Sequence, residues 1–149
     1  MKKILIQTLI ISLFFINFNA TAEIKHIKDG NVDAKVKLVV FESLTCSHCG
    51  DFHRDIYPKL KTDFIDKNLI SIEYRNFPLD IAAFNAAKIA HCRNDGKSEI
   101  LHHLYNNQSS WVRGSTIEDL NKNLKRVVQE SGFKLDFDNC IANSKIEDF

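Results

Sequence analysis

The sequence has few prolines and glycines and almost no net charge. Two of its 149 residues are proline and five are glycine, which excludes collagen-like and low-complexity chains. The formal net charge of +1 predicts no basic surface for nucleic acid. Hydrophobic residues make up 44% and charged residues 26%, a balance typical of folded chains. We therefore expect one globular domain, neither disordered nor a polytopic membrane protein, with no nucleic-acid partner.

Residues 1–22 have the three-part pattern of a secretory signal peptide. Lys2 and Lys3 give a positive start, residues 4–18 are nearly all apolar, and residues 20–22 (Ala-Thr-Ala) have small side chains at the cleavage positions. The apolar run is shorter than the roughly 20 residues of a membrane span. We expect cleavage after Ala22, export of residues 23–149 and an oxidising compartment. An uncleaved N-terminal anchor is the alternative.

The order of elements after residue 23 predicts an α/β domain that carries a helical insertion. Largely apolar, β-branched runs predict strands, and apolar residues at helical spacing predict helices. We expect strands at residues 24–28, 37–42 and 69–74, a helix after residue 46, and a block of further helices near residues 81–92, 100–106, 117–128 and 137–146.

The helix after residue 46 has one apolar stripe. Phe52, Ile56, Leu60 and Phe64 recur every four residues, so they share one helical face, and we expect that face in the core. Pro58 lies within the same helix and is expected to kink it.

Two later helices have N-terminal signals. Asp80 precedes an alanine-rich helix as a candidate cap, and Ser115 with Glu118 has the spacing of a capping box. His102 and His103 stand next to each other on a short helix, and we interpret them as part of its surface and packing rather than as a site.

The candidate catalytic residues are in Cys46-Ser47-His48-Cys49. At the start of a helix this spacing places both sulfurs on one side, and the first sulfur lies against free backbone amides and the positive end of the helix dipole. These donors favour the thiolate, so the pKa of Cys46 is expected below the ordinary thiol value. His48 adds a donor or partial positive charge, and Cys49 is the resolving thiol. The pattern indicates thiol–disulfide exchange through a mixed disulfide on Cys46.

Three other readings of this pair remain open. A zinc site needs two further ligands. The candidates are His53, four residues after Cys49, and Cys92 with its neighbour His91, but Cys92 is not part of a second Cys-x-x-Cys pair. A c-type haem site needs His directly after the second cysteine, where Gly50 stands. An inert structural disulfide is the third alternative. We expect no metal and no cofactor.

Cys92 and Cys140 have no motif around them. They lie 48 residues apart in the helical block, and in an oxidising compartment a structural disulfide between them is the simplest interpretation. Closing such a loop is worth about 3–4 kcal/mol in the chain-entropy description. Two buried free thiols or an intermolecular bond are the alternatives.

Residues 39–58, VVFESLTCSHCGDFHRDIYP, resemble the DsbA-like thioredoxin-fold oxidoreductases of bacterial periplasms, most closely the alphaproteobacterial type. Residues 74–80, the alanine-rich helix that ends at Cys92, residues 108–111 and Cys140 match as well. The resemblance implies a thioredoxin-like fold with a helical insertion. It also implies a periplasmic enzyme that oxidises exported proteins with free thiols and is reoxidised by a membrane partner. It assigns attack to Cys46 and resolution to Cys49.

Two local departures from that family lie close to the cysteines. Ser47 stands where the family usually has proline, so Ser47 and His48 are the expected redox-tuning positions. The buried acid usual in the family falls at Val40, and Glu42, one strand step away on the same face, is a candidate replacement.

The third departure concerns the C-terminal half of the fold. Pro58 and Pro78 are the only prolines, and both precede the helical insertion, whereas the family's cis-proline loop follows it. We expect the last strands and helix of the fold to be missing, which leaves at most three strands and an uncovered sheet edge. The alternatives to an oxidase are therefore a reductase or isomerase of the same fold and a non-catalytic truncated fragment that lacks the substrate groove.

Overall fold

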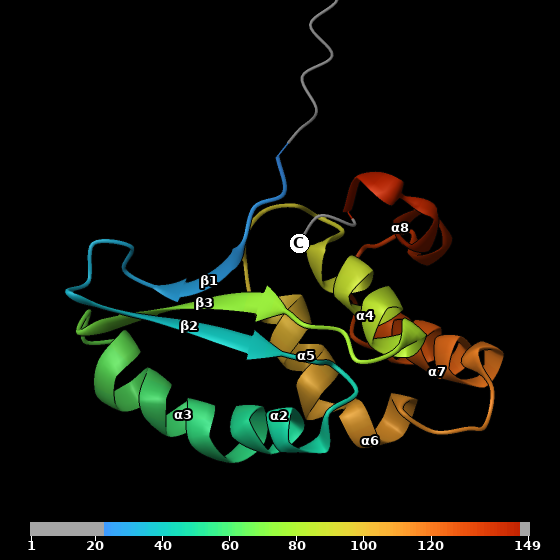
Figure 1. The fold of residues 1–149 in the computed structure, drawn as a ribbon, viewed down its shortest axis with the longest axis horizontal. Coiled ribbons are helices and arrows are strands. Elements are labelled where there is room, and N and C mark those ends of the chain that lie inside the picture. Colours follow the sequence, from blue (N-terminus) through green and yellow to red (C-terminus); the bar gives the residue numbers. More distant parts are fainter. Residues whose placement is uncertain (1–22, 147–149) are drawn as a thin grey trace, which may run out of the picture.

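The computed structural model describes residues 23–146, so the expected signal peptide lies outside the described residues. A three-stranded sheet is at the centre (Figure 1). Strands β1 (Ile27–Gly30), β2 (Val36–Glu42) and β3 (Ile70–Asn76) are in the order β1-β3-β2. β3 pairs antiparallel with β1 and parallel with β2. Among the described residues, no helix is both long and apolar enough to cross a membrane.

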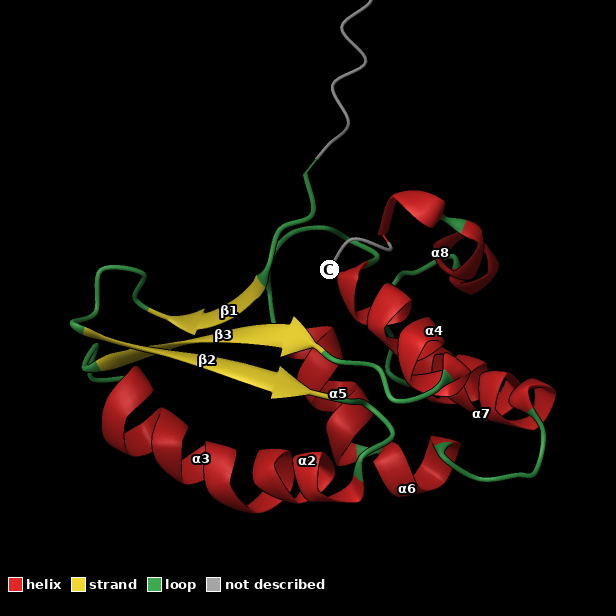
Figure 2. Cartoon of the chain, viewed as in Figure 1, coloured by secondary structure: helices red, strands yellow, loops and turns green. Residues whose placement is uncertain are grey.

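One continuous helical rod runs along one face of the sheet (Figure 2). It consists of α2 (Ser47–Asp51), a π-helical segment (Phe52–Ile56), α3 (Tyr57–Leu60) and a second π-helical segment (Lys61–Ile65). Pro58 is the second residue of α3 and lies inside the rod, two residues after the end of the π-helical segment Phe52–Ile56. The rod therefore continues through Pro58, and its geometry changes in the π-helical turn that precedes it.

The remaining helices form the insertion on the other side of the active-site loop. They are α4 (Ile81–His91), α5 (Glu99–Asn106), α6 (Gln108–Trp111), α7 (Ile117–Glu130) and α8 (Phe137–Ala142), with a short 3-10 turn at Ser144–Ile146. α4 contacts α5, α7 and α8 through a face of buried small residues, as its sequence predicts. That face contains Ala83, Ala86, Ala87 and Ala90.

Two helix caps were predicted from the sequence, and the structure confirms the cap of α4 but places the capping box of α7 one residue later. Asp80 accepts a hydrogen bond from the amide of Ala83 at 2.7 Å and caps α4 as expected. The capping box of α7 is formed by Thr116 and Asp119, not by Ser115 and Glu118. The reason is that Thr116 is the last extended residue, so the box falls one position later than the spacing of Ser115 suggested.

Only part of the apolar stripe of the rod faces the core, which corrects the expectation from the sequence: Leu60 packs against the core and Phe52 is half-buried. Ile56 is 52% exposed and Phe64 is 43% exposed, while His53, one residue along from Phe52, is only 2% exposed. The inward face also contains the buried His53 and the half-buried Tyr57. Burial of these polar groups is possible because each has hydrogen-bond partners in the interior.

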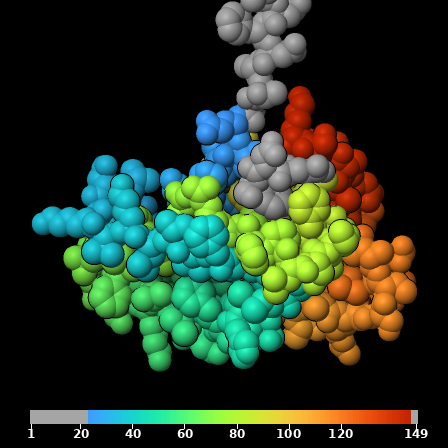
Figure 3. Space-filling view, in the orientation of Figure 1, coloured from blue at the N-terminus to red at the C-terminus, as the bar shows by residue number. Residues whose placement is uncertain are grey.

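The sheet has one covered and one open face among the described residues. Leu38, Val40 and Glu42 of β2 alternate toward the core, whereas Val39 and Phe41 point the opposite way. Phe41 is 70% exposed, and β2 pairs only with β3 within residues 23–146. In the space-filling view the segment that contains β2 lies at the molecular surface (Figure 3). This open face and edge match the uncovered sheet that the sequence predicts.

Candidate active site

Cys46 lies where a short loop from β2 enters the helical rod. Its amide donates to the carbonyl of Ser43 at 3.0 Å, and its own carbonyl accepts from Gly50 at 3.1 Å. Cys46 has extended backbone angles and is the N-cap residue of α2. Cys46 and Cys49 are both free thiols and both partly buried. The structure thus places the two cysteines at a helix start, as the motif predicts.

The surroundings of Cys46 favour its thiolate. The backbone amide of Cys49, the Cys49 thiol and the backbone amide of His48 all lower the pKa of Cys46, and they outweigh partial burial and the negative charge of Asp51. These donors act directly on a sulfur at the positive end of the helix. A sulfur in such surroundings is more readily a thiolate, and hence a better leaving group, than an ordinary thiol.

The surroundings of Cys49 have the opposite effect. Burial, together with the negative charges of Cys46 and Glu42, raises the pKa of Cys49 to about 11, although the backbone amide of Ser43 opposes this rise. At neutral pH Cys49 is accordingly a thiol. A proton must leave this sulfur whenever it forms a bond and return whenever the bond opens.

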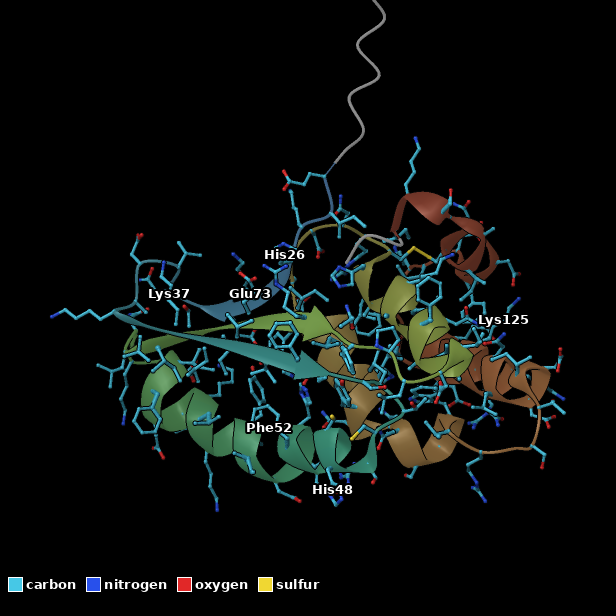
Figure 4. The ribbon with its side chains drawn as sticks, in the orientation of Figure 1. His26, Lys37, His48, Phe52, Glu73 and Lys125 are labelled. Carbon is cyan, nitrogen blue, oxygen red and sulfur yellow. A yellow bond between two sulfur atoms is a disulfide. The ribbon has the colours of Figure 1, made fainter. Side chains whose placement is uncertain are left out.

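Ser47 and His48, the two positions between the cysteines, are exposed. The His48 side chain is 94% exposed, points away from the protein (Figure 4), and has its Nδ1 3.6 Å from Asp51 Oδ2. His48 acts on Cys46 through its backbone amide. The redox-tuning role of these two side chains stays a prediction.

Gln108 of α6 holds the active-site loop. Its Nε2 donates to the carbonyl oxygens of Leu44 and Cys46, both at 2.8 Å, and its side chain is buried. Gly50 makes room for this side chain, because a Cβ on Gly50 would lie 2.4 Å from Gln108 Oε1. No local sequence signal marks Gln108 as a loop anchor, since its partners are more than 60 residues away.

A second set of contacts ties the loop to the segment that follows β3. Thr45 Oγ1 donates to Asp80 Oδ2 at 2.8 Å, and the amide of Leu79 donates to Ser43 Oγ at 3.3 Å. Asp80 thus caps α4 with one carboxylate oxygen and holds the loop with the other. The helical insertion therefore holds the active-site loop at two places, through Gln108 of α6 and through Asp80 at the start of α4.

The buried acid beside the cysteines is Glu42. Val40 is half-buried, whereas Glu42 is 3% exposed and its Oε2 lies 2.8 Å from His53 Nε2. Glu42 thus has the burial that the resemblance associates with an acid at Val40. Burial lowers the pKa of His53, and the hydrogen bond and charge of Glu42 oppose this decrease.

Cys92 and Cys140 are joined in a disulfide between the end of α4 and α8, with their Cα atoms 5.4 Å apart. Their sulfurs are bonded to each other and therefore cannot complete a zinc site with Cys46 and Cys49. Within residues 23–146 no group of three or more His, Cys, Asp or Glu side chains is arranged to hold a metal ion.

Comparison with known proteins identifies the family of this chain. A sequence model of the family described as Thioredoxin matches residues 22–149. The chain belongs to this family. It is 31% identical over 120 residues to a putative protein-disulfide oxidoreductase of Rickettsia bellii. This match covers 78% of this chain and 45% of the Rickettsia protein. The chain is 30% identical over 112 residues to the probable disulfide bond formation protein D of Bacillus cereus, covering 72% of this chain and 50% of that protein.

The solved structures place this thioredoxin-family chain among the DsbA-like proteins. The crystal structure of Wolbachia pipientis alpha-DsbA1 is 32% identical, with a TM-score of 0.73, and the match covers 83% of this chain and 62% of that one. The α/β thioredoxin-like fold with a helical insertion is thereby confirmed. The chain spans about half the length of the curated relatives it matches.

Proposed function

We propose that this chain exchanges thiols and disulfides at Cys46 and Cys49. The proposal is based mainly on one observation: the surroundings lower the pKa of Cys46 and raise the pKa of Cys49, three residues later. Cys46 is favoured as a thiolate, and Cys49 is held as a thiol with a pKa raised to about 11. A pair with this asymmetry has one sulfur that is attacked and released easily and a second that resolves the mixed disulfide.

The oxidising reaction proceeds in two displacement steps. A substrate thiolate attacks Cys46 Sγ, the Cys46–Cys49 bond breaks, and Cys49 leaves with the electron pair and takes up a proton. A second substrate thiolate then attacks the substrate sulfur of the mixed disulfide and releases Cys46 as a thiolate. The substrate loses two electrons, the chain gains two, and a partner disulfide must reoxidise the chain.

The direction we propose is oxidation of exported proteins in the periplasm. Stabilisation of the Cys46 thiolate stabilises the reduced pair, which makes its disulfide a stronger oxidant. The signal-peptide pattern of residues 1–22 supports export. Relatives named for disulfide bond formation support the same chemistry. The substrates are exported proteins with free thiols, and the reoxidant is a membrane partner.

A redox titration of the purified protein tests this proposal. The protein is equilibrated with glutathione at graded ratios, trapped by alkylation, and the state of Cys46 and Cys49 is determined by peptide mass spectrometry. We expect a single midpoint nearer the value of about −120 mV for DsbA than the value of about −270 mV for thioredoxin. A midpoint near the thioredoxin value would support the reductase or isomerase alternative.

The open sheet supports one further candidate, a chain without catalytic activity. Phe41 is 70% exposed on a strand with one free edge among the described residues, as expected if the substrate groove is incomplete. The same titration distinguishes a non-catalytic chain from an active oxidoreductase. A non-catalytic chain would show partial oxidation of Cys46 and Cys49 without a single midpoint.

A further inference from the structure

Three consecutive side-chain hydrogen bonds run through the interior from Glu42 to Asp29. Glu42 Oε2 lies 2.8 Å from His53 Nε2, and His102 Nε2 lies 2.8 Å from Asp29 Oδ2. Between them, His53 Nδ1 lies 2.9 Å from His102 Nδ1. The side chains of Glu42 and His53 are 2% and 0% exposed, and those of Asp29 and His102 are 15% and 14% exposed. His102 thus belongs to a buried network, which corrects its interpretation as part of a helix surface.

This network joins parts of the fold that are far apart in the sequence. Its members come from four elements, namely β1 (Asp29), β2 (Glu42), the rod (His53) and α5 (His102). Both imidazole rings are packed on aromatic side chains. His53 stacks on Tyr105 with ring centroids 3.9 Å apart, and His102 stacks on Tyr57 with centroids 4.0 Å apart. The stacking holds each ring in an orientation in which both of its nitrogens face a partner.

Asp29, at the outer end of the network, is a carboxylate that only accepts. The hydroxyl groups of Tyr57 and Tyr74 each donate to its Oδ2 at 2.9 Å, and Ser98 donates to its Oδ1. Burial acts to raise the pKa of Asp29, but the hydrogen bonds from His102, Ser98 and Tyr57 outweigh it and lower the pKa to about 2. The proton between His102 and Asp29 therefore resides on His102 Nε2.

The two inner hydrogen bonds need one proton more than two neutral histidines supply. If His102 were neutral, its Nδ1 would be a bare acceptor, so His53 would have to donate from its own Nδ1. A neutral His53 would then turn a bare Nε2 toward Glu42 Oε2 at 2.8 Å, a distance at which no water fits between them. Two facing acceptors in the interior are strongly unfavourable. The geometry therefore requires a third proton, shared by His53, His102 and Glu42.

His102 is the favoured place for this third proton. Burial lowers the pKa of His53 and disfavours a charge there, although the hydrogen bond and the charge of Glu42 oppose this decrease. A positive charge on His102 instead lies in direct contact with the Asp29 carboxylate. With both nitrogens of His102 protonated, its Nδ1 donates to His53 Nδ1, and His53 Nε2 donates to an ionised Glu42. Each bond of the network then has a donor and an acceptor.

The outer end of the network is accessible to solvent. Asp29 and Tyr57 line a polar cavity of about 420 Å³ that opens to the surface beside Lys61 and Asp66. The inner members of the network are closed off by the surrounding side chains. A proton held by the histidines can therefore exchange with the solution from the Asp29 side, and its binding depends on the external pH.

We propose that His53 and His102 form a buried proton-binding site that locks α5 to β1 and to the rod, and that this lock opens when the shared proton is lost in alkaline solution. Loss of the proton leaves two facing acceptors in the interior, which weakens the contact between these elements. In the unfolded chain histidine has its ordinary pKa of about 6.5 and does not hold this proton at higher pH. The stabilisation is therefore complete below about pH 6.5 and is lost as the pH rises into the alkaline range.

Other titratable groups face the histidine pair from every element packed against it. They are Asp29, Glu42, Cys46, Cys49, Tyr57, Tyr74 and Tyr105. Burial, followed by the charge of Asp29 or Glu42, raises the pKa of each of the three tyrosines, so they stay neutral up to pH 9. The two cysteines do not titrate when they are bonded to each other. The oxidised protein therefore isolates the histidine pair, and its behaviour does not depend on the proposed exchange chemistry.

NMR of the oxidised, otherwise unchanged protein tests the shared proton directly. Nitrogen spectra report the protonation of the imidazole rings, and carbon spectra report that of the Glu42 carboxyl. We expect His53, His102 and Glu42 to carry three protons in total at pH 7.5. Two singly protonated rings beside an ionised Glu42 would overturn the proposal.

Substitution His102→Phe tests the link to pH, with His103→Phe on the same helix as the matched control. Phenylalanine keeps a ring to stack on Tyr57 but has no nitrogen to hold a proton. Because unfolding releases one proton, the unfolding equilibrium constant of the unchanged protein and of His103→Phe should rise about tenfold from pH 7.5 to 8.5. Urea denaturation of the oxidised protein measures it, and for His102→Phe we expect a rise of less than about twofold.

Two results would overturn the lock. One is an unfolding constant of the unchanged protein that does not rise over this range, and the other is an equal rise in His102→Phe and His103→Phe. If His102→Phe fails to fold, the proton count and the pH dependence of the unchanged protein decide. Absence of exchange with glutathione would refute the proposed function and leave these measurements unaffected.

Discussion

Gln108 Nε2 donates a hydrogen bond of 2.8 Å to the carbonyl oxygen of Cys46, 62 positions earlier in the sequence. This hydrogen bond connects the helical insertion to the residue that we propose as the nucleophile. The same side-chain nitrogen also donates to the carbonyl of Leu44, so the loop before α2 is fixed at two successive points. The insertion is thereby part of the active-site support and not only an addition to the sheet.

Replacing Gln108 should weaken both the loop and the fold. Gln108→Ala leaves two carbonyl groups without their buried donor, which is expected to lower the free energy of unfolding by about 1–3 kcal/mol. Urea denaturation followed by circular dichroism measures this loss. Gln129→Ala, at an exposed glutamine of α7, is the control and should change stability by less than about 0.5 kcal/mol. Equal stabilities for the two variants would contradict the anchoring role.

Gly50 and Gln108 should show strong coupling in a double-mutant cycle. In the unchanged protein Gly50→Ala places a Cβ 2.4 Å from Gln108 Oε1 and should cost about 1–3 kcal/mol. In the Gln108→Ala background the remaining close neighbour is the end of the flexible Arg54 side chain at 2.8 Å, which can move away, so alanine should be better than glycine within a helix by about 0.5–1 kcal/mol. Additive effects in urea denaturation would show that the two side chains do not interact.

The two active-site thiols should react with iodoacetamide in different pH ranges. Because the pKa of Cys46 is lowered and that of Cys49 is raised to about 11, Cys46 is expected to react at neutral pH and Cys49 only in strongly alkaline solution. Peptide mass spectrometry of the reduced protein at a series of pH values follows both sites. Cys46→Ser removes the fast site, and unfolding in urea should make the reactivities equal. Equal rates in the folded protein would refute the asymmetry.

Stability should decrease on acidification in a range set by His91. Burial lowers the pKa of His91 to about 4 from its ordinary value of 6.5. Between these values the unfolded chain binds a proton that the folded chain does not, so stability is fully present above pH 6.5 and is lost as the pH falls toward 4. This difference amounts to up to about 3 kcal/mol. Urea denaturation at pH 7.5 and 4.5 measures it, and His91→Gln should reduce the dependence to the part that the buried His53–His102 pair contributes, in which the pKa of His53 is lowered.

The two faces of β2 should respond differently to a charge. Phe41→Lys, at a 70% exposed side chain, is expected to change the unfolding free energy by less than about 0.5 kcal/mol and to reduce self-association through the open face. Val40→Lys, on the covered face next to it, should cost several kcal/mol. Sedimentation velocity reports the association, and urea denaturation the stability. Similar losses for both variants would show that the outer face is covered in solution.

Most of the architecture could be predicted because it depends on local patterns. The runs that form β2 and β3, the alanine face of α4 and the Cys-Ser-His-Cys helix start are each visible within fewer than fifteen residues. The cap of α4 at Asp80 belongs to the same class of signal. The capping box of α7 was displaced by one residue because both Ser115 and Thr116 are suitable caps, and only the backbone angles of Thr116 decide between them.

The interior of the site could not be predicted from periodicity. An apolar stripe led us to place Phe52 and Ile56 in the core, whereas His53 is the residue that the fold buries. Histidine becomes favourable there only because Glu42 and His102, 11 and 49 positions away, supply both ring nitrogens with partners. Such pairings depend on tertiary contacts, for which a single sequence has no signal.

The hydrogen bonds of Asp29 limit which substitutions related sequences can accept at this position and at its donors. Its carboxylate receives donors from three other parts of the fold, from Tyr57 on the rod, Tyr74 on β3, and Ser98 and His102 at α5. An amide at this position would present its own hydrogens to some of those donors, so no single substitution is neutral. Aligned relatives should therefore keep or lose the acid and its donors as a set, and the five positions should covary although they span 74 residues of sequence.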